Sequence, residues 1–504
     1  MECTIHLKDE RETARLAETL SLAMVPGDWI ALSGTLGAGK TSFARAFIRH
    51  GLDEGDAEVP SPTFTLVQLY EGGRFSPMAH LDLYRLGDGE ELLELGLEEA
   101  LETGVALVEW PDKGEGFLPP ACFHLHLEQG EGDEERLATI TAPQDPMARL
   151  HRSHHIRAFL DSHGHGQSSR HFLTGDASAR AYETVRPLKG EELVLMNAPA
   201  TPDGPVLEKW GKPYSQVAHL AENLAAFVGV AGALAEKGLA VPALHQYDLD
   251  AGLLLLDHLG SDGIIDDDRQ PMEERYGAAM DLLAHMHTMD WQAACAKPAE
   301  APHTIPPYDR TAMLVEADLL AQWYAPWCLG RPLDDQEQAQ FEAIWNGLID
   351  GLADAPITLV LRDYHSPNII WRGEETGHAR IGIIDFQDAL MGPAAYDVAS
   401  LAQDARVDVP VEVEQRLLAR YINARADDKS FDIETFKAQY AIMAALRATK
   451  ILGIFIRLSQ RDGKHAYRAH LPCMQHYLQR ALQHEALADY AAWVNTVLVR
   501  PESG

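Results

Sequence analysis

The 504-residue sequence is poor in cysteine, in long apolar runs and in basic residues. Its five cysteines are scattered and form no C-x-x-C pair, which argues against a disulfide framework and against a structural zinc site. No stretch approaches the ~20 apolar residues that span a bilayer. The first residues also lack the apolar core of a signal peptide. We therefore expect a cytoplasmic protein with no membrane partner.

Basic residues are outnumbered: 42 Lys and Arg face 76 Asp and Glu, for a formal net charge of -34. Because such an excess repels phosphate backbones, we expect no direct nucleic-acid binding. The hydrophobic share of 46% is ordinary for a globular protein, and the length predicts more than one domain. An acidic run at 128–135 and the loop signal ending at Pro146 predict domains over residues 1–146 and 147–504.

A phosphate-binding motif, G-x-x-x-x-G-K-[ST], occupies residues 34–41. It stands between an expected strand over 28–33 and an expected helix over 42–50, which is the context that the motif requires. Lys40 is expected to reach the β- and γ-phosphates of a nucleotide, and Thr41 to ligate Mg²⁺. The residues predicted to bind nucleotide here are Gly34, Gly37, Gly39, Lys40, Thr41 and Ser42.

Two carboxylates follow apolar stretches at 78–81 and 105–108. Asp82 and Glu109 are thereby predicted to lie within strands or at their ends, where they suit Mg²⁺ coordination or the positioning of an attacking water. Isolated carboxylates on strands are more often simply solvated. The spacing alone therefore leaves both interpretations open.

The P-loop, S-P-T-F-T-L-V at 61–67, H-L-D-L-Y-R at 80–85 and V-E-W at 108–110 together resemble the bacterial TsaE family. That family consists of small ATPases needed to make threonylcarbamoyladenosine in tRNA. The resemblance implies a TsaB/TsaD-like complex as partner, through which tRNA is contacted indirectly. The resemblance also implies that Thr65 belongs to a nucleotide-responsive switch loop and Asp82 to the Mg²⁺ site. It places Glu109 and Trp110 in the ATPase site.

A second group of residues that indicates nucleotide binding begins around 172–196. Here we expect a strand, a turn of small residues, a second strand and then a third strand. Such a loop covers ATP phosphates in kinases, although a plain hairpin has the same pattern. We expect Ser178 and Arg180 at the phosphates, and the strand that ends at Asp257 to hold adenine. Two further cations stay open as alternatives to Arg180: Lys209 and Lys212.

The most informative segment is R-D-Y-H-S-P-N at 362–368, followed by a second strand-end aspartate, Asp385. Asp363 is expected to accept the proton of a substrate hydroxyl. Asn368 and Asp385 are expected to hold Mg²⁺ against the ATP phosphates, since this ion prefers hard oxygen ligands.

These motifs resemble the aminoglycoside-phosphotransferase-like kinases. G-D-A-S-A-R at 175–180, D-F-Q-D at 385–388 and K-I-L-G-I-F at 450–455 are closest to the AmgK-like sugar kinases of that superfamily. The resemblance implies an ATP-dependent kinase of cell-wall recycling that phosphorylates the anomeric hydroxyl of an amino sugar, N-acetylmuramate or N-acetylglucosamine. Arg362 departs from the superfamily, which commonly has His there, and Asp397 is expected to anchor the loop.

The sequence as a whole predicts an α/β P-loop NTPase domain followed by a bilobal, protein-kinase-like α+β domain of the aminoglycoside-phosphotransferase type. The predicted function is bifunctional: an ATPase that supports tRNA modification and a sugar 1-kinase, both using ATP and Mg²⁺. One alternative stays open, namely a kinase of another small alcohol (an aminoglycoside, choline or homoserine). In that case the N-terminal domain would be a nucleotide-dependent regulatory module. No acceptor-binding role is assigned to the aromatic and polar candidates Tyr308, Asp309, Trp323, Trp327 and Trp371.

Overall fold

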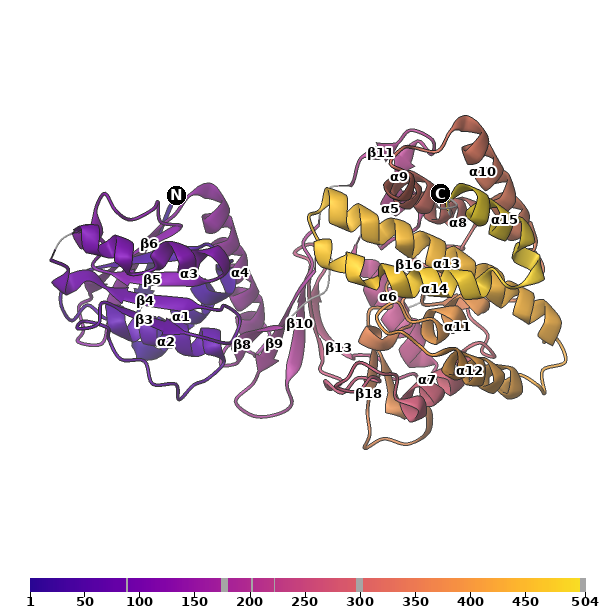
Figure 1. The fold of residues 1–504 in the computed structure, drawn as a ribbon. Helices are drawn as coiled ribbons and strands as arrows, with labels where there is room; N and C mark the ends of the chain where they lie inside the picture. Colours follow the sequence, from indigo (N-terminus) through magenta and orange to yellow (C-terminus); the bar gives the residue numbers. More distant parts are fainter. Residues whose placement is uncertain (88, 174–179, 201–202, 222, 296–301, 499–504) are drawn as a thin grey trace. The chain divides into compact units, whose positions relative to one another are not determined.

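The computed structural model describes the whole chain except residues 88, 174–179, 201–202, 222, 296–301 and 499–504 (Figure 1). The chain forms two compact units, Met1–Asn197 and Ala198–Gly504. The predicted boundary between residues 146 and 147 falls within helix α4 (Gln144–Ser162) and stays a prediction. Among the described residues, no helix has both the length and the apolar character needed to cross a membrane.

The first unit is built on a seven-stranded sheet, whose strands in spatial order are β1 (Glu2–Leu7), β7 (Arg136–Thr141), β6 (Phe123–Gln129), β2 (Trp29–Ser33), β5 (Val105–Glu109), β4 (Met78–Asp82) and β3 (Val67–Tyr70). Strand β2 runs parallel to both of its neighbours, β5 and β6, and β4 runs parallel to β5. The remaining pairings are antiparallel. The carboxyl ends of β2, β4 and β5 therefore meet at one edge of the sheet.

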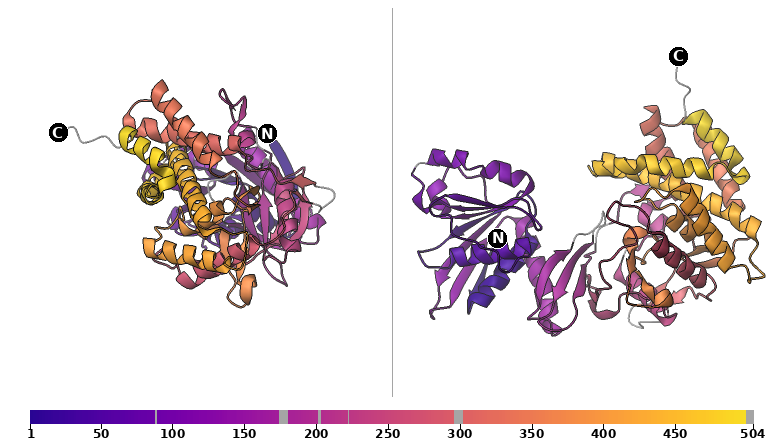
Figure 2. Two further views of the ribbon diagram at one scale, coloured as in Figure 1. Left: turned by 90° about the vertical axis from the view of Figure 1, so that its right-hand side faces the viewer. Right: turned by 60° about the horizontal axis from the view of Figure 1, so that its bottom comes forward.

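Helices cover both faces of this sheet, namely α1 (Glu10–Ala23), α2 (Lys40–Leu52) and α3 (Leu97–Thr103) (Figure 2). Side chains alternate along β2: Ile30 and Leu32 are buried in the cluster that includes α1 and α2, whereas Trp29 and Ala31 are buried in the cluster that includes α3. Because both faces of the strand are buried, its sequence is a nearly continuous apolar run. This confirms the strand predicted over 28–33.

After α4 the chain forms three antiparallel strands, β8 (Ser169–Leu173), β9 (Ala181–Arg186) and β10 (Leu193–Asn197). The guanidinium of Arg170 on β8 is fully buried and pairs with Glu183 on β9 at 2.7 Å. The predicted succession of three strands is confirmed. The small-residue turn between the first two lies outside the described residues.

The second unit is mainly helical, and it contains α13 (Ile433–Arg461), a helix of 29 residues (Figure 1). Helices α8 (Arg310–Leu319), α11 (Ala395–Ala402) and α14 (Leu471–Ala481) pack against it. Its other longer helices are α6 (Leu224–Glu236), α7 (Glu273–Met286), α10 (Asp335–Asp350), α12 (Val411–Ala424) and α15 (Ala488–Val497). Its shorter helices are α5 (Tyr214–Val217) and α9 (Ala325–Leu329).

Short antiparallel strand pairs complete this unit, and some of them lie beside the residues for which the sequence predicts chemistry. They are β13 (Leu244–Asp248) with β14 (Leu253–Asp257), β17 (Ile357–Val360) with β20 (Leu390–Pro393), β18 (Ile369–Trp371) with β19 (Ile381–Ile383), β11 (Val206–Leu207) with β12 (Lys212–Pro213), and β15 (Ala294–Cys295) with β16 (His303–Thr304).

Candidate active sites

The first candidate site begins where β2 ends. The phosphate-binding motif forms the connection from Ser33, the last residue of β2, to Lys40, the first residue of α2. Gly34 has a φ of 135°, and a Cβ there would lie 2.3 Å from the Leu127 carbonyl oxygen, so the turn requires glycine. The connection places the N-terminus of α2 at this edge of the sheet, where its unpaired N–H groups and dipole favour anions.

Lys40 lies folded against this loop. Its Nζ donates hydrogen bonds of 2.9 Å to the carbonyl oxygens of Gly34 and Thr35, and it lies 3.8 Å from the centre of the Trp110 ring. Burial lowers the pKa of Lys40, although the nearby carboxylates of Glu109 and Asp82 favour its charged form. An ammonium is therefore held at the place where the motif predicts phosphate.

Asp82 and Glu109 are the last residues of neighbouring strands and lie directly opposite each other in register. Glu109 accepts a hydrogen bond of 3.1 Å from Thr41 Oγ1. Its other oxygen lies 3.0 Å from Nε2 of His80, and both of these side chains are buried. The parallel strands thus bring together three residues that were predicted separately, and they add His80, whose role the sequence did not indicate.

Two hydroxyl groups that the sequence analysis missed complete the surroundings of Asp82. Ser61 Oγ and Thr63 Oγ1 donate hydrogen bonds of 2.9 Å and 2.6 Å to its Oδ2. Both lie in the S-P-T-F-T segment, so their residue types were a signal that could have been used. Thr65, predicted as a switch residue, lies in an exposed turn of the same segment. Its role stays a prediction.

These side chains surround a cavity of about 320 Å³. Hydroxyl and carboxylate oxygens of Thr41, Asp82 and Glu109 are the hard donors that Mg²⁺ prefers, so the site fits that ion. Gly34 shapes the loop without lining the cavity. The lining comprises Leu36, Gly37, Gly39, Lys40, Thr41, Ser42, Ser61, Thr63, Asp82, Tyr84, Glu109 and Trp110.

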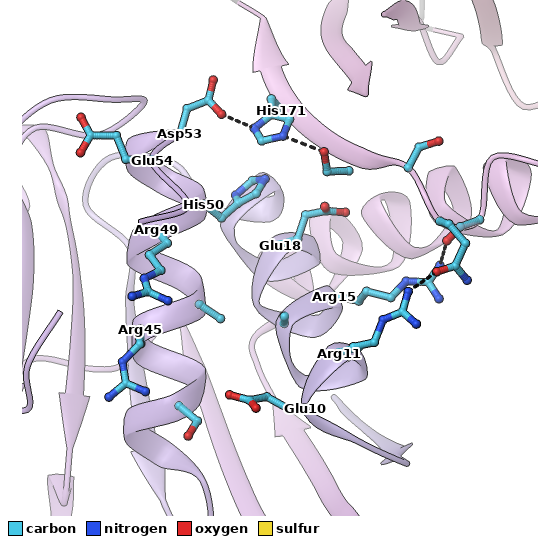
Figure 3. A pocket seen from close by; sticks show the side chains of 18 residues that line it. Glu10, Arg11, Arg15, Glu18, Arg45, Arg49, His50, Asp53, Glu54 and His171 are labelled. Carbon is cyan, nitrogen blue, oxygen red and sulfur yellow. Dashed lines mark hydrogen bonds and ion pairs between the residues drawn. The ribbon is translucent and has the colours of Figure 1, made fainter. Parts of the chain in front are cut away.

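A second cavity of the first unit, about 570 Å³, is lined from α1, α2 and the segment that leads into β8 (Figure 3). Its arginines are already engaged: Arg15 donates to Asp161 and to the Gly166 carbonyl, and Arg49 donates to the Ala57 carbonyl. Among the residues that the structure describes, the lining has four carboxylates and four arginines, so these charges balance. The sequence predicts nucleotide binding at only one of its residues, Ser42, and we assign no ligand to it.

The second candidate site is built from the loops after β17 and β19. The backbone N–H groups of Leu361 and Arg362 donate hydrogen bonds of 2.6 Å and 2.9 Å to the carboxylate of Asp397, which is fully buried. Arg362 itself has a φ of 68°, in the left-handed region that is strained for most side chains. The predicted anchoring role of Asp397 is therefore confirmed.

The same loops bring Asp363, Asn368 and Asp385 together. Asn368 Nδ2 donates a hydrogen bond of 2.9 Å to the backbone carbonyl of Asp363. The N–H of Ile384, the residue before Asp385, donates to the Asn368 carbonyl at 3.0 Å. Because the Asn368 amide nitrogen is used in the loop, its Oδ1 remains as an acceptor. This oxygen and the Asp385 carboxylate fit a Mg²⁺ site.

A buried cluster of charges lies beneath this loop. Glu316 of α8 forms ion pairs with Arg362 and with Lys450 of α13, whose Nζ lies 2.9 Å away. Burial alone would raise the pKa of Asp363, but the positive charges of Lys450, His365 and Arg362 outweigh it and lower the pKa. Asp363 is therefore held as a carboxylate, the form that can accept a proton.

The other residues that the sequence predicts to bind the nucleotide of the kinase are described one by one. Ser178 lies outside the described residues, and Arg180 lies directly before β9. Asp257 ends β14, as predicted, and contacts His245 Nε2 at 2.6 Å. Lys209, one alternative phosphate cation, contacts two carboxylates, the nearer at 2.7 Å. The identity of the phosphate cation stays a prediction.

Comparisons with known proteins divide along the chain in the same way. Residues 7–138 match the family described as "Threonylcarbamoyl adenosine biosynthesis protein TsaE", and residues 163–432 match the "Phosphotransferase enzyme family". The chain is 36% identical over 351 residues to the N-acetylmuramate/N-acetylglucosamine kinase of Caulobacter vibrioides, which covers 67% of this chain and 94% of that protein.

For the first unit, the chain is 40% identical over 135 residues to the tRNA threonylcarbamoyladenosine biosynthesis protein TsaE of Rickettsia felis, covering 27% of this chain and 78% of that protein. A further relative, the N-acetylmuramate/N-acetylglucosamine kinase of Neisseria meningitidis, is 31% identical over 61% of this chain and 84% of its own length. The predicted fold class, a P-loop α/β domain followed by a kinase-like domain, is confirmed.

Proposed function

The chain belongs to the phosphotransferase enzyme family and carries a TsaE-family domain, and from this premise we propose that it is a bifunctional enzyme. The C-terminal domain, residues 147–504, phosphorylates the anomeric hydroxyl of N-acetylmuramate and N-acetylglucosamine in cell-wall recycling. The N-terminal domain, residues 1–146, hydrolyses ATP in support of tRNA threonylcarbamoyladenosine formation. Both work in the cytoplasm.

In the kinase reaction, Asp363 accepts the proton of the sugar hydroxyl as that oxygen attacks the terminal phosphate of ATP. Its lowered pKa favours the carboxylate that this step needs. Asn368 and Asp385 would hold Mg²⁺, which neutralises the charge of the ATP phosphates. The observation that carries the proposal is the hydrogen bond that Asn368 Nδ2 donates to the Asp363 carbonyl, which brings the two loop residues together. It is supported by the similarity of the chain to an N-acetylmuramate/N-acetylglucosamine kinase.

In the ATPase reaction, Lys40 binds the phosphates, and Thr41 and Asp82 would hold Mg²⁺. Glu109, fixed between Thr41 and His80, orients the attacking water. We propose that the partner of this domain is a TsaB/TsaD-like complex and that this complex contacts the tRNA. A net charge of -34 is compatible with this arrangement, because the partner rather than this chain meets the RNA.

The kinase proposal is tested by offering the purified full chain ATP with a panel of acceptors: N-acetylmuramate, N-acetylglucosamine, an aminoglycoside, choline and homoserine. Phosphorylation of the two sugars at the anomeric position supports it, as seen by ³¹P NMR of the product. Selective phosphorylation of one of the other alcohols would replace it with the alternative function.

The ATPase proposal is tested with purified TsaB and TsaD, tRNA and ATP, with and without this chain. Formation of threonylcarbamoyladenosine should depend on the chain and be lost in Lys40→Ala, while the exposed-residue control Lys113→Ala retains it. If Lys40→Ala supports modification as well as the wild type does, the ATPase role is wrong. The regulatory-module alternative would then gain support if Lys40→Ala instead changes the kinase rate.

A further inference from the structure

The first unit, Met1–Asn197, contains parts of both matched families. The TsaE-family part of the chain is residues 7–138, and the phosphotransferase-family part begins at residue 163. Strands β8, β9 and β10 therefore belong to the phosphotransferase-family part, although they lie in the same compact unit as the P-loop site. The contacts that hold β8 and β9 there come from helices on both sides of this division.

Charged side chains from different elements are buried together at this contact: Glu18 of α1, Arg157 of α4, Arg170 of β8 and Glu183 of β9. Oε1 of Glu18 accepts a hydrogen bond from Arg157, and its Oε2 accepts one of 3.1 Å from the backbone N–H of Arg170. Arg170 in turn donates from Nε and Nη2 to the two carboxylate oxygens of Glu183, at 2.7 Å and 2.9 Å. A carboxylate of the TsaE-family part thus joins a buried charge network of the phosphotransferase-family strands.

Helix α2 reaches the same strands at its C-terminal end. Nε2 of His50 lies 2.5 Å from the Arg170 carbonyl oxygen, and its ring stacks on that of His171, with the ring centres 5.3 Å apart (Figure 3). Directly after α2, the Asp53 carboxylate lies 2.8 Å from Nδ1 of His171 and accepts a hydrogen bond of 2.6 Å from Nη1 of Arg186 on β9. Because α2 begins in the phosphate-binding motif, one helix connects the P-loop site with these strands.

Burial decides how much these contacts contribute to the position of β8. An exposed ion pair stabilises a protein little, whereas the loss of one member of a buried pair leaves an uncompensated charge in the interior. Without the charge of Glu18, Arg157 would lose its carboxylate, and the N–H of Arg170 would lose a charged acceptor. The position of β8 therefore depends on a side chain of α1.

We infer that α1 and α2 make the TsaE-family part a structural component of the kinase, because they hold β8 and β9, the strands next to the predicted ATP contact. The inference rests on the proposed kinase function. It also uses the predicted phosphate contact of Arg180, which lies directly before β9. The ATP-binding part of the kinase thus extends beyond residues 147–504 and includes Glu18 and Asp53.

The test compares the full-length wild type with Glu18→Gln, which keeps the length of the side chain and removes its charge. The acceptor is whichever compound of the panel above the wild type phosphorylates. The KM for ATP in that reaction should rise at least fivefold, and the KM for the acceptor should stay within twofold. Amide hydrogen exchange, followed by mass spectrometry, should become at least tenfold faster in peptides that cover β8 and β9. Glu10→Gln, at an exposed position of α1, is the matched control and should change none of these values.

Asp53→Asn is the second variant and should fold even if Glu18→Gln does not. Its side chain is exposed, and asparagine tolerates the left-handed backbone of this position, where φ is 56°. The KM for ATP should rise at least twofold, and exchange in β8 and β9 should become faster. Asp56→Asn, also exposed, should match the wild type.

The inference is wrong if a folded Glu18→Gln protein keeps the wild-type KM for ATP or the wild-type exchange in β8 and β9. It is equally wrong if Glu18→Gln does not fold and Asp53→Asn behaves as the wild type does. If the wild type phosphorylates none of the acceptors, the proposed kinase function fails. Faster exchange in Glu18→Gln would then leave the contact standing without the kinase, and unchanged exchange would overturn both.

Discussion

Glu316 forms an ion pair with Arg362 in the interior of the second unit. Arg362 is the residue directly before Asp363, the proposed base. The side chains of Glu316 and Arg362 are almost completely buried, and Lys450 shares the same carboxylate. Two cations therefore depend on one anion, which links helices α8 and α13 to the catalytic loop. The cluster also provides the positive charges that lower the pKa of Asp363.

Removing the charge of Glu316 is expected to destabilise the second unit. Glu316→Gln leaves two buried cations without their counter-ion, and breaking a buried pair costs about 3–5 kcal/mol. The free energy of unfolding from urea denaturation measures the loss. Glu273→Gln removes an exposed partner of Arg416 and should cost less than about 1 kcal/mol. Equal effects in the two variants would contradict the role given to burial.

Asp363→Asn is expected to abolish sugar phosphorylation without unfolding the protein. Loss of a general base typically lowers the rate about 10²–10⁴-fold, and asparagine preserves the size of the side chain. The turnover number is measured with saturating sugar and ATP, alongside the melting temperature. Asp354→Asn, at an exposed position, serves as the control. A turnover number within a few-fold of the wild type would exclude Asp363 as the base.

The stability of the second unit is expected to fall in acid because of Asp404. Burial alone would raise its pKa, but His365 and the backbone N–H groups of Arg406 and Ser366 outweigh it and lower the pKa to about 2, from an ordinary 3.8. Folding thus favours the ionised form. Its stabilisation is fully present above about pH 4 and is lost as the pH falls through about 2, a change on the order of 2 kcal/mol.

The free energy of unfolding, measured by urea denaturation at several pH values between about 5 and about 2, reports this effect, because that interval covers the protonation of the Asp404 carboxylate. The wild type should lose more stability across that interval than Asp404→Asn, which cannot ionise. Asp267→Asn, at an exposed position, should follow the wild-type curve. Parallel curves for the wild type and Asp404→Asn would show that the carboxylate does not contribute in this way.

His80 is expected to act as a positioning residue for Glu109. His80→Leu removes the contact of 3.0 Å and keeps the hydrogen bond that Thr41 Oγ1 donates to Glu109. ATP turnover by the first domain should fall about tenfold, the size of a lost hydrogen bond to a charged group, while the KM for ATP stays within twofold. His80→Gln should recover part of the turnover. A rise in KM alone would contradict positioning and indicate a binding role.

The sequence predicted the local elements of the first site well, because the chemistry there is encoded by short contiguous patterns. Gly34, Lys40 and Thr41 belong to one motif, and a strand before it and a helix after it are both present. The contacts of His80 with Glu109, and of Glu109 with Asp82 across the two strands, could not be predicted. They depend on which strands pair in parallel and in which register, and that is set by packing across the whole sheet.

By itself, the sequence determined the two sets of phosphate and metal motifs, their order and the residue types at Asp363, Asn368 and Asp385. Only the tertiary structure decided what surrounds them. Glu316 and Lys450 approach the catalytic loops from distant parts of the chain. The physical reason is that a motif specifies local backbone and chemistry, whereas charge compensation, unsatisfied polar atoms and cavities arise only when separate elements pack together.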